Sequence, residues 1–204
     1  MQHSQTISAT AAIRNRNVVQ ETTDESLVAS IAQGDKRALQ TLYGRHNVRV
    51  FRFALRFLND QSMAEDMVSE VFLDVWRQAA RFEARSKVST WLLAMARNKA
   101  LSVLRRSSTE ELDGEVAETI KDPSDDPEVS MQKQQQISML QECLAQLSPA
   151  HREIVDLVYY HGKTIEDVAA IVRVPANTVK TRMFYARKRI AELLAAKGVE
   201  RSWL

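Results

Sequence analysis

The chain has 204 residues, 45% of them hydrophobic, and a formal net charge of +2 at pH 7. Five Gly and four Pro beside abundant Ala, Leu, Arg, Gln and Glu favour a largely helical protein of one domain or two small ones. The single Cys143 excludes an internal disulfide framework, and the sequence has no apolar run near the roughly 20 residues that span a bilayer. Because the N-terminus also lacks the apolar core of a secretory signal, we expect a soluble cytoplasmic protein.

The first helices follow a polar, unpatterned stretch at 1–22, which we expect to be a mobile tail. Asp24 is expected to cap a short helix that Gly34 ends. Asp35 is expected to cap the next helix, which continues toward Leu58. Helical structure is therefore predicted from the first residues after the tail.

Two further helices are predicted before the composition changes. Ser62 followed by Glu65 forms a capping-box pattern in front of a periodic segment that reaches Phe82. Another helix runs from about Thr90 to Arg106. These four segments together predict a first helical domain.

The amino-acid composition then changes to an acidic stretch that contains Pro123 and Pro127 and few large apolar residues. Such a stretch cannot bury enough surface to offset its ordering entropy, so we expect a flexible acidic linker. We therefore predict an all-α fold of two small helical domains. The expected organisation is a tail at 1–22, a helical domain at 23–107, the linker at 108–130, a helical domain at 131–197 and a tail at 198–204.

Helical signals return in the second domain. Ser148–Pro149 is a cap and first-turn pair for a helix that reaches Tyr160. Gly162 breaks that helix, Thr164 starts a short new one, and a turn near Arg173–Val174 precedes the last helix. Two short helices joined by a tight turn predict a helix-turn-helix.

The last helix has two contrasting faces. At 100° per residue, an apolar stripe of Val179, Met183, Ala186 and Ile190 must face the core. The opposite face and its edges are basic and aromatic, with cations suited to phosphates or guanine edges and with Thr, Phe and Tyr suited to thymine methyls or sugars. The alternative is that the aromatic side chains pack against a neighbouring helix. The candidate DNA-binding residues are Asn177, Thr178, Lys180, Thr181, Arg182, Phe184, Tyr185, Arg187 and Lys188.

The helix from Thr90 carries a second candidate surface. Its buried side is predicted to hold Leu92, Leu93, Ala96, Ala100, Val103 and Leu104. The other side presents Trp91, Met95, Asn98, Ser102 and Arg105, with Arg97 and Arg106 at the edges. Aromatic, amide and guanidinium groups on one face suit bases that have left their stack. The alternative is that Trp91 packs onto the preceding loop and the arginines are ordinary solvated charges.

A third surface lies on the helix that begins near Ser62. Its outward stripe places the apolar Leu73 among carboxylates, which repel phosphate, so it resembles a protein contact more than a DNA contact. The alternative is one stray leucine on a solvated acidic face. The stripe and its neighbour comprise Asp66, Glu70, Leu73, Asp74 and Arg77.

Two other functions compete with this interpretation. A one-component DNA-binding regulator would need a sensory domain and a dimer, and the first domain has no Gly-rich phosphate loop or phosphoacceptor pattern. An enzyme is a more distant alternative, because the four His are scattered and Cys143 has no metal-ligand spacing around it. We therefore expect no catalytic residue, metal, cofactor or small-molecule substrate.

The sequence resembles a bacterial sigma factor of the extracytoplasmic-function type, a member of the sigma-70 family. The matching motifs are D-E-S-L-V-A-S-I-A-Q-G-D, A-E-D-M-V-S-E-V-F-L-D-V-W-R, W-L-L-A-M-A-R-N-K-A, L-S-P-A-H-R-E-I-V and T-V-K-T-R-M-F-Y-A-R-K-R. The resemblance covers about Asp24 to Leu194 and implies a sigma region 2 domain at 23–107 and a sigma region 4 domain at 131–197. It also implies a promoter-recognising polymerase subunit without catalysis of its own.

The resemblance further implies roles for the three surfaces. The segment Asp66–Trp76 would bind the clamp helices of the largest subunit of core RNA polymerase, and the polymerase flap is a second expected contact. The helix at Lys180–Arg187 would read the minus-thirty-five element, and the loop Glu83–Ser89 with the helix after it would recognise and melt the minus-ten element. The linker would thread toward the polymerase active centre. The implied minus-ten residues are Trp91, Arg97, Asn98, Lys99, Ser102, Arg105 and Arg106.

Two positions depart from the family pattern. Tyr185 stands where the family often has a basic residue, so the upstream sequence that is read is expected to differ. Ser102 replaces the usual Asp after the R-N motif, which changes the local hydrogen bonding of the minus-ten helix. Promoter DNA, core polymerase and an anti-sigma protein are the expected partners, without membrane insertion.

Overall fold

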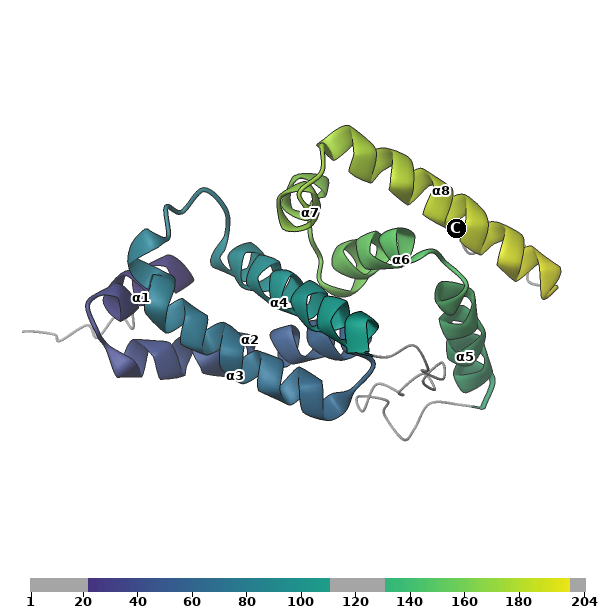
Figure 1. The fold of residues 1–204 in the computed structure, drawn as a ribbon. Helices are drawn as coiled ribbons and strands as arrows, with labels where there is room; N and C mark the ends of the chain where they lie inside the picture. Colours follow the sequence, from purple (N-terminus) through teal and green to yellow (C-terminus); the bar gives the residue numbers. More distant parts are fainter. Residues whose placement is uncertain (1–21, 111–130, 199–204) are drawn as a thin grey trace, which may run out of the picture.

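The computed structural model describes residues 22–110 and 131–198, and these two parts are all-helical (Figure 1). Residues 111–130 of the expected linker, and the parts of both expected tails before Thr22 and after Gly198, lie outside the described residues, whereas 108–110 form the end of α4. The N-terminal domain consists of α1 (Asp24–Ala32), α2 (Lys36–Leu58), α3 (Gln61–Gln78), the 3-10 turn η1 (Ala79–Arg81) and α4 (Val88–Glu110). The C-terminal domain consists of α5 (Met131–Ala145), α6 (Pro149–Val155), the π-helical turn η2 (Asp156–Tyr160), α7 (Ile165–Val172) and α8 (Ala176–Ala196).

The core of the N-terminal domain forms where α2 packs against α1, α3 and α4. Large side chains such as Leu42, Phe53 and Leu92 are almost fully buried there. Burying one such side chain stabilises a fold by about 1.5–3 kcal/mol, so this shared core holds the four helices together. On α3 the predicted inward residues are confirmed as buried: Val68, Val71, Phe72 and Val75.

Two of the predicted helix caps are wrong by one or two positions. The cap of α1 is Thr23, whose hydroxyl accepts from the Ser26 amide at 3.2 Å, whereas Asp24 lies inside the first turn. The cap of α3 is Asp60, whose carboxylate accepts from the Met63 amide at 2.8 Å, so Ser62 lies inside that helix. In each case an earlier residue with a side-chain acceptor caps the helix instead.

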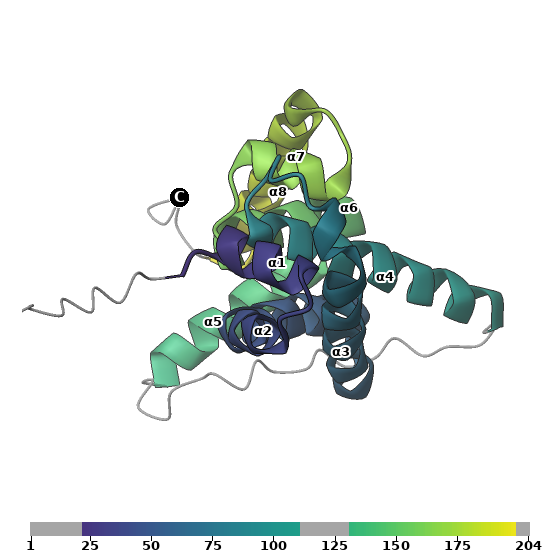
Figure 2. The same ribbon diagram turned by 90° about the vertical axis from the view of Figure 1, so that its left-hand side faces the viewer.

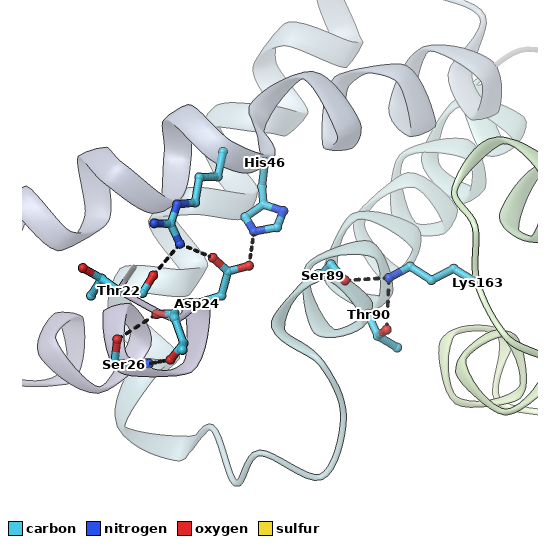
Figure 3. A network of polar contacts seen from close by, with 9 residues as sticks. Thr22, Asp24, Ser26, His46, Ser89, Thr90 and Lys163 are labelled. Atoms are coloured by element: carbon cyan, nitrogen blue, oxygen red, sulfur yellow. Dashed lines mark hydrogen bonds and ion pairs between the residues drawn. The ribbon is translucent and has the colours of Figure 1, made fainter. Parts of the chain in front are cut away.

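Asp24 lies one residue past the cap, and its side chain contacts α2 instead of capping α1. Its carboxylate accepts from Arg45 at 2.9 Å and lies 2.6 Å from His46 Nε2, which ties α1 to α2 (Figure 3). Burial acts to raise the pKa of Asp24, but the hydrogen bonds from Arg45 and His46 outweigh it and hold the pKa below its usual value. This contact fixes the entry of the chain into the N-terminal domain.

Three other predicted caps are confirmed, whereas two predicted helix ranges differ from the structure. The segment predicted to reach Phe82 is α-helical only to Gln78 and continues as η1 to Arg81, and the helix predicted from about Thr90 to Arg106 runs from Val88 to Glu110. Asp35 caps α2, Ser148 caps α6 with Pro149 in its first turn, and Thr164 caps α7. Gly162 takes a φ of 61° directly after the π-helical turn, a conformation that favours glycine. The predicted helix to Tyr160 therefore exists, but its last five residues widen from α to π geometry.

One predicted core position of α4 is wrong. Leu104 is 39% exposed, although its spacing places it on the buried stripe. The end of α4 projects beyond the other helices of its domain, as Figure 2 shows. The stripe therefore runs past the surface that covers its earlier members, such as Leu92 and Ala100.

The two domains are in contact. In both ribbon views α4 runs beside α6 and α7, and α4 packs against α7 (Figures 1 and 2). The helix α8 packs on α5, α6 and α7, at the outer edge of the molecule away from α2 and α3. In the described parts of the chain, no helix is long and apolar enough to cross a membrane.

Candidate nucleic-acid interface

The structure places the predicted outer residues of α8 on an open surface, which we call the α8 face. Phe184 and Tyr185 are 63% and 52% exposed, with their rings 5.5 Å apart in an edge-to-face contact. The two rings pack against each other. The alternative that they pack against a neighbouring helix is therefore not what the structure shows. The exposed members are Asn177, Lys180, Thr181, Phe184, Tyr185, Arg187 and Lys188, and the half-buried ones are Thr178 and Arg182.

The helix-turn-helix that carries this face is fixed by local interactions. The Thr164 hydroxyl accepts from the Asp167 amide at 3.1 Å, and the Asp167 carboxylate accepts from the Thr164 amide at 3.3 Å, which makes a reciprocal capping box. Arg173 ends α7 in the left-handed conformation with a φ of 58°. Val179 and Met183 of α8 are buried, as predicted. The α8 face is therefore held in place by the capped and buried parts of its own domain.

The pKa of Asp167 reflects the same capping arrangement. Burial acts to raise this pKa, but hydrogen bonds from Thr90 and Thr164 outweigh it and lower the pKa below its usual value. Asp167 thus remains a carboxylate at neutral pH and keeps accepting from both hydroxyl residues. One of these, Thr90, belongs to the N-terminal domain, so the cap of α7 is also a contact between domains.

Tyr159 is a residue beside the α8 face that the sequence analysis did not select. Its hydroxyl accepts from Arg187 Nε at 3.0 Å, and the guanidinium carbon of Arg187 lies 5.8 Å from the centre of the Tyr159 ring. The side chain is 59% exposed and comes from η2. The signal in the sequence was the pair Tyr159–Tyr160, two large aromatic residues side by side after an apolar run.

The face of α4 that holds Trp91 is only partly open, and we call it the α4 face. Trp91 is half-buried and its ring lies 4.8 Å from that of Phe82, so it packs onto the loop before α4. Asn98 and Ser102 are also half-buried. The Ser102 hydroxyl donates to the Asn98 carbonyl oxygen at 2.9 Å. The hydrogen bond of this residue, which departs from the family pattern, therefore stays within α4.

The cations of α4 have different surroundings. Arg97 makes a two-pronged ion pair with Glu153 of α6. Lys99 lies 2.9 Å from Asp74 and 3.2 Å from Glu70 on α3. Arg105 and Arg106 are exposed on the projecting end of α4. Two of the candidate minus-ten cations are therefore neutralised by carboxylates of the same chain.

The Lys99 pairs also change its pKa. Burial acts to lower this pKa, but the hydrogen bonds to Asp74 and Glu70 prevail and raise it above the usual value. The ammonium group thus stays charged and links α4 to the acidic stripe of α3. The structure therefore joins a candidate minus-ten residue to the candidate polymerase-binding surface.

The outward stripe of α3 lies where the sequence predicted it, and we call it the α3 stripe. Leu73 is 53% exposed between carboxylates. Asp74 is half-buried, and its carboxylate lies 3.8 Å from Arg77. The remaining members, Asp66, Glu70 and Arg77, are exposed.

Cys143 and two of the histidines lie in the core or beside a carboxylate. Cys143 is buried with a free thiol, and the described residues contain no group of three or more His, Cys, Asp or Glu that could hold a metal ion. His46 and His161 each lie beside one carboxylate, Asp24 and Asp156.

Two family models match the chain, one on each domain. The model described as sigma-70 region 2 matches residues 42–110, and the model described as sigma-70, region 4 matches residues 137–190. The first match contains α4 and the α3 stripe, and the second contains the helix-turn-helix. Together they span more than half of the chain.

Curated relatives and solved structures agree with these matches. The RNA polymerase sigma-H factor of Pseudomonas aeruginosa is 29% identical over 84% of this chain and 93% of its own length. The ECF RNA polymerase sigma factor SigL of Mycobacterium tuberculosis is 28% identical over 85% of this chain and 98% of its own length.

Two solved structures share the fold with a TM-score of 0.63 each. The sigma factor RpoE of Bartonella quintana, in complex with the anti-sigma factor NepR, is 25% identical over 76% of this chain and 96% of its own. CnrH, in complex with the cytosolic domain of CnrY, is 22% identical over 85% and 97%. The chain therefore belongs to the sigma-70 family of RNA polymerase sigma factors, in its ECF group.

Proposed function

We propose that this sigma factor binds core RNA polymerase through the α3 stripe, reads the minus-thirty-five element with the α8 face and melts the minus-ten element with the α4 face. The observation that carries the proposal is the α8 face itself, where exposed cations surround an exposed aromatic pair on a capped helix-turn-helix. Such a face serves no purpose in a solvated helix, whereas cations and aromatic groups together suit the major groove.

The polymerase contact rests on the α3 stripe. An apolar Leu73 that is 53% exposed among carboxylates fits a protein surface that offers a small apolar site with basic residues around it. DNA does not offer such a surface, because its phosphates repel carboxylates. The clamp helices of the largest polymerase subunit and its flap are the proposed contacts on core polymerase.

A pull-down with purified core polymerase tests this contact. We expect Leu73→Arg to weaken binding, while the stability of the chain changes by only about 0.5 kcal/mol, because the substitution is on the surface. Val48→Arg is the matched control, since Val48 is an apolar residue of α2 that is 55% exposed and lies on a different helix from the stripe. Normal polymerase binding by a folded Leu73→Arg variant would remove the α3 stripe from the proposal.

Transcription tests the function as a whole. We expect core polymerase with this chain to start transcripts from a set of promoters that core polymerase alone does not use. A variant with Lys180→Ala and Arg187→Ala should keep its affinity for core polymerase and lose those transcripts, because only the promoter contact is removed. Transcription without this dependence on the α8 face would contradict the assignment of the minus-thirty-five surface.

An anti-sigma protein is the proposed regulatory partner. The solved complex of RpoE with the anti-sigma factor NepR supports this, since that sigma factor shares the fold of this chain along most of its length. Purification of the chain from its native cells, followed by identification of the proteins that accompany it, tests the proposal. Loss of transcription when the accompanying protein is added back would support the assignment.

A further inference from the structure

The helix α2 carries an excess of positive charge that the proposed function does not use. Its 23 residues include six cations and no Asp or Glu. The acidic side chains lie on neighbouring elements instead, and α3 alone has four of them: Glu65, Asp66, Glu70 and Asp74. The charge of α2 is therefore not neutralised along its own length.

Four of the six cations share one side of the helix. At 100° per residue, Arg45, Arg49, Arg52 and Arg56 fall within an arc of about 60° and extend over about 16 Å of the helix axis. We call these four residues the α2 stripe. Arg45, Arg49 and Arg52 are exposed, and Arg56 is half-buried.

The two ends of the α2 stripe have partners within the chain, whereas its middle does not. Arg45 donates to Asp24 at 2.9 Å, and Arg56 donates to Asp156 at 2.8 Å. Among residues 22–110 and 131–198, neither Arg49 nor Arg52 forms an ion pair. The middle of the stripe thus presents two exposed arginines that are available to an anion from outside the chain.

The α2 stripe lies beside the loop that precedes α4. Burial is the largest cause of the lowered pKa of Lys163, and repulsion from Arg49 and Lys87 lowers it further. Arg49 of α2 and Lys87 of the loop therefore lie near the same point. The Lys87 carbonyl oxygen accepts from the Trp91 amide at 3.1 Å, so Lys87 is one helical turn from Trp91. Cations gathered in this way repel one another unless an anion neutralises them.

The chemistry of the stripe favours nucleic-acid phosphates. Sites for single-stranded DNA combine a positive surface along the backbone with aromatic side chains on which bases stack. The α2 stripe supplies the positive surface, and the rings of Phe82 and Trp91, 4.8 Å apart, lie in the neighbouring loop and helix. A row of arginines without polar readers between them suits phosphates better than base edges. The centre of a protein interface, in contrast, is depleted of charged residues.

We propose that the α2 stripe binds the phosphate backbone of single-stranded promoter DNA, with Arg49 and Arg52 as its contacts. The inference rests on the proposed function of the α4 face and adds to it a contact that is independent of base sequence, on a different helix. Arg49 and Arg52 are outside the sets of residues that the sequence analysis selected. The bases of the same strand would meet Trp91 while the stripe neutralises the phosphates.

The salt dependence of oligonucleotide binding tests the proposal. The probe is a labelled oligothymidylate of about 16 nucleotides, and its affinity for the full chain is measured by fluorescence anisotropy at several salt concentrations. The test variant is Arg49→Gln with Arg52→Gln. The matched control is Lys36→Gln with Arg37→Gln, two exposed cations of the first turn of α2 that lie outside the stripe. Circular dichroism confirms that each variant folds.

We expect the test variant to flatten the slope of log affinity against log salt by about 1.4, because each phosphate contact with a single strand contributes about 0.7. Each single substitution should have about half of this effect, which keeps the test valid if the double variant does not fold. The control should leave the slope nearly unchanged. Arg49→Lys with Arg52→Lys should keep most of it, since a lysine also neutralises a phosphate.

Two results would overturn the proposal. The first is an equal slope in the folded test variant and in the control, because the charge of α2 would then act without a defined contact. The second is normal oligonucleotide binding by the test variant together with weakened binding to core polymerase, because the stripe would then be a protein contact. Failure of the proposed function is distinct, since the unmodified chain would then direct no transcription by core polymerase, whatever its affinity for the oligonucleotide.

Discussion

The two surfaces proposed to bind DNA differ in how much of each is exposed. On α8, the aromatic pair and most of the cations are exposed to solvent. On α4, Trp91 and Asn98 are half-buried, and Arg97 is paired with Glu153 of the other domain. The surface proposed for duplex DNA is therefore open, whereas the surface proposed for separated strands is partly covered. This order of exposure matches the order in which a promoter offers duplex and then single strands.

The difference has a chemical basis. The α8 face is fixed by contacts within the C-terminal domain, namely the Thr164 capping box and the buried stripe beneath it. On the α4 face, by contrast, Arg97 is paired with Glu153 of the other domain. The α8 face is thus supported by its own domain, whereas one charge of the α4 face is neutralised by the other domain.

The largest effect is expected from substituting the residues of the α4 face that are proposed to contact unpaired bases. Each stacking contact between a base and an aromatic side chain contributes roughly 1–3 kcal/mol, so Trp91→Ala should reduce open-complex formation by about ten- to a hundredfold. Asn98→Ala should act in the same direction with a smaller loss. Permanganate reactivity of promoter thymines measures the melted fraction.

A premelted template provides the control for this prediction. Both variants should regain activity on a promoter with an unpaired bubble, because the step that they impair has then been bypassed. Equal defects on duplex and bubble templates would contradict a role in melting. Because Trp91 also packs on Phe82, thermal unfolding of Trp91→Ala must be compared with that of Asn98→Ala.

A pH-dependent change of about tenfold is expected in the balance between packed and separated domains. It arises where Lys163 of the C-terminal domain donates to the hydroxyl groups of Ser89 and Thr90 of α4 (Figure 3). Burial lowers the pKa of Lys163 to about 8, against a usual value of 10.5, with opposition from Asp167 and support from Arg49 and Lys87. Packing of the two domains on each other thus favours the neutral amine. This packing should strengthen as the pH rises from about 8 toward 10.5, and below about 8 it should no longer change through this group.

The measurement is the radius of gyration of the full chain between pH 7 and pH 9.5. We expect the radius to decrease as the pH rises, because a smaller fraction of chains has separated domains. Lys163→Met is the matched variant, because it removes the titrating group and keeps a side chain of similar length. Thr90 retains its hydrogen bond to Asp167 in this variant. An identical pH response in both chains would contradict the assignment to Lys163.

The sequence was sufficient for features that depend on local spacing. The buried stripe of α8 is an example, since Val179, Met183, Ala186 and Ile190 recur at helical intervals and are all buried. The caps at Asp35, Ser148 and Thr164 were also predictable, because a capping residue needs only its own turn as a partner. The exposed position of Leu73 follows from the same periodicity.

Features that depend on contacts between residues far apart in the sequence could not be predicted from it. Arg56 and Asp156 are 100 residues apart, and Arg97 and Glu153 are 56 apart. A charged residue in a sequence carries no mark of the opposite charge that it will meet, so Arg97 was assigned to DNA without its carboxylate partner. The widening of η2 was also unpredicted, because its spacing differs from an α-helix by only one residue per turn.

A smaller effect concerns sequence preference on the open surface. Tyr185 lies at the centre of the α8 face and is 52% exposed. Tyr185→Arg should change the selected minus-thirty-five sequences, because an arginine there is able to pair with guanine for roughly 1–3 kcal/mol of discrimination. Transcription with core polymerase on a randomised upstream library measures this. Unchanged selection would show that Tyr185 is not a reader.

The smallest expected effect is at Tyr159, which orients one cation of the α8 face. Its hydroxyl accepts from Arg187 Nε at 3.0 Å, which leaves the two terminal nitrogens of the guanidinium directed elsewhere. Tyr159→Phe keeps the ring and removes only the hydroxyl, and a typical hydrogen bond contributes about 0.5–1.5 kcal/mol, so promoter binding should weaken by a few-fold.

Lys188→Ala gives the contrast that identifies a positioning role for Tyr159. Loss of a phosphate contact at Lys188 should flatten the salt dependence by about one unit of slope. Tyr159→Phe should leave that slope nearly unchanged, because Arg187 keeps its charge. In an Arg187→Ala background Tyr159→Phe should have no further effect, since the hydroxyl then has no guanidinium to hold. A full effect of Tyr159→Phe in that background would mean that the hydroxyl contacts DNA itself, independently of Arg187.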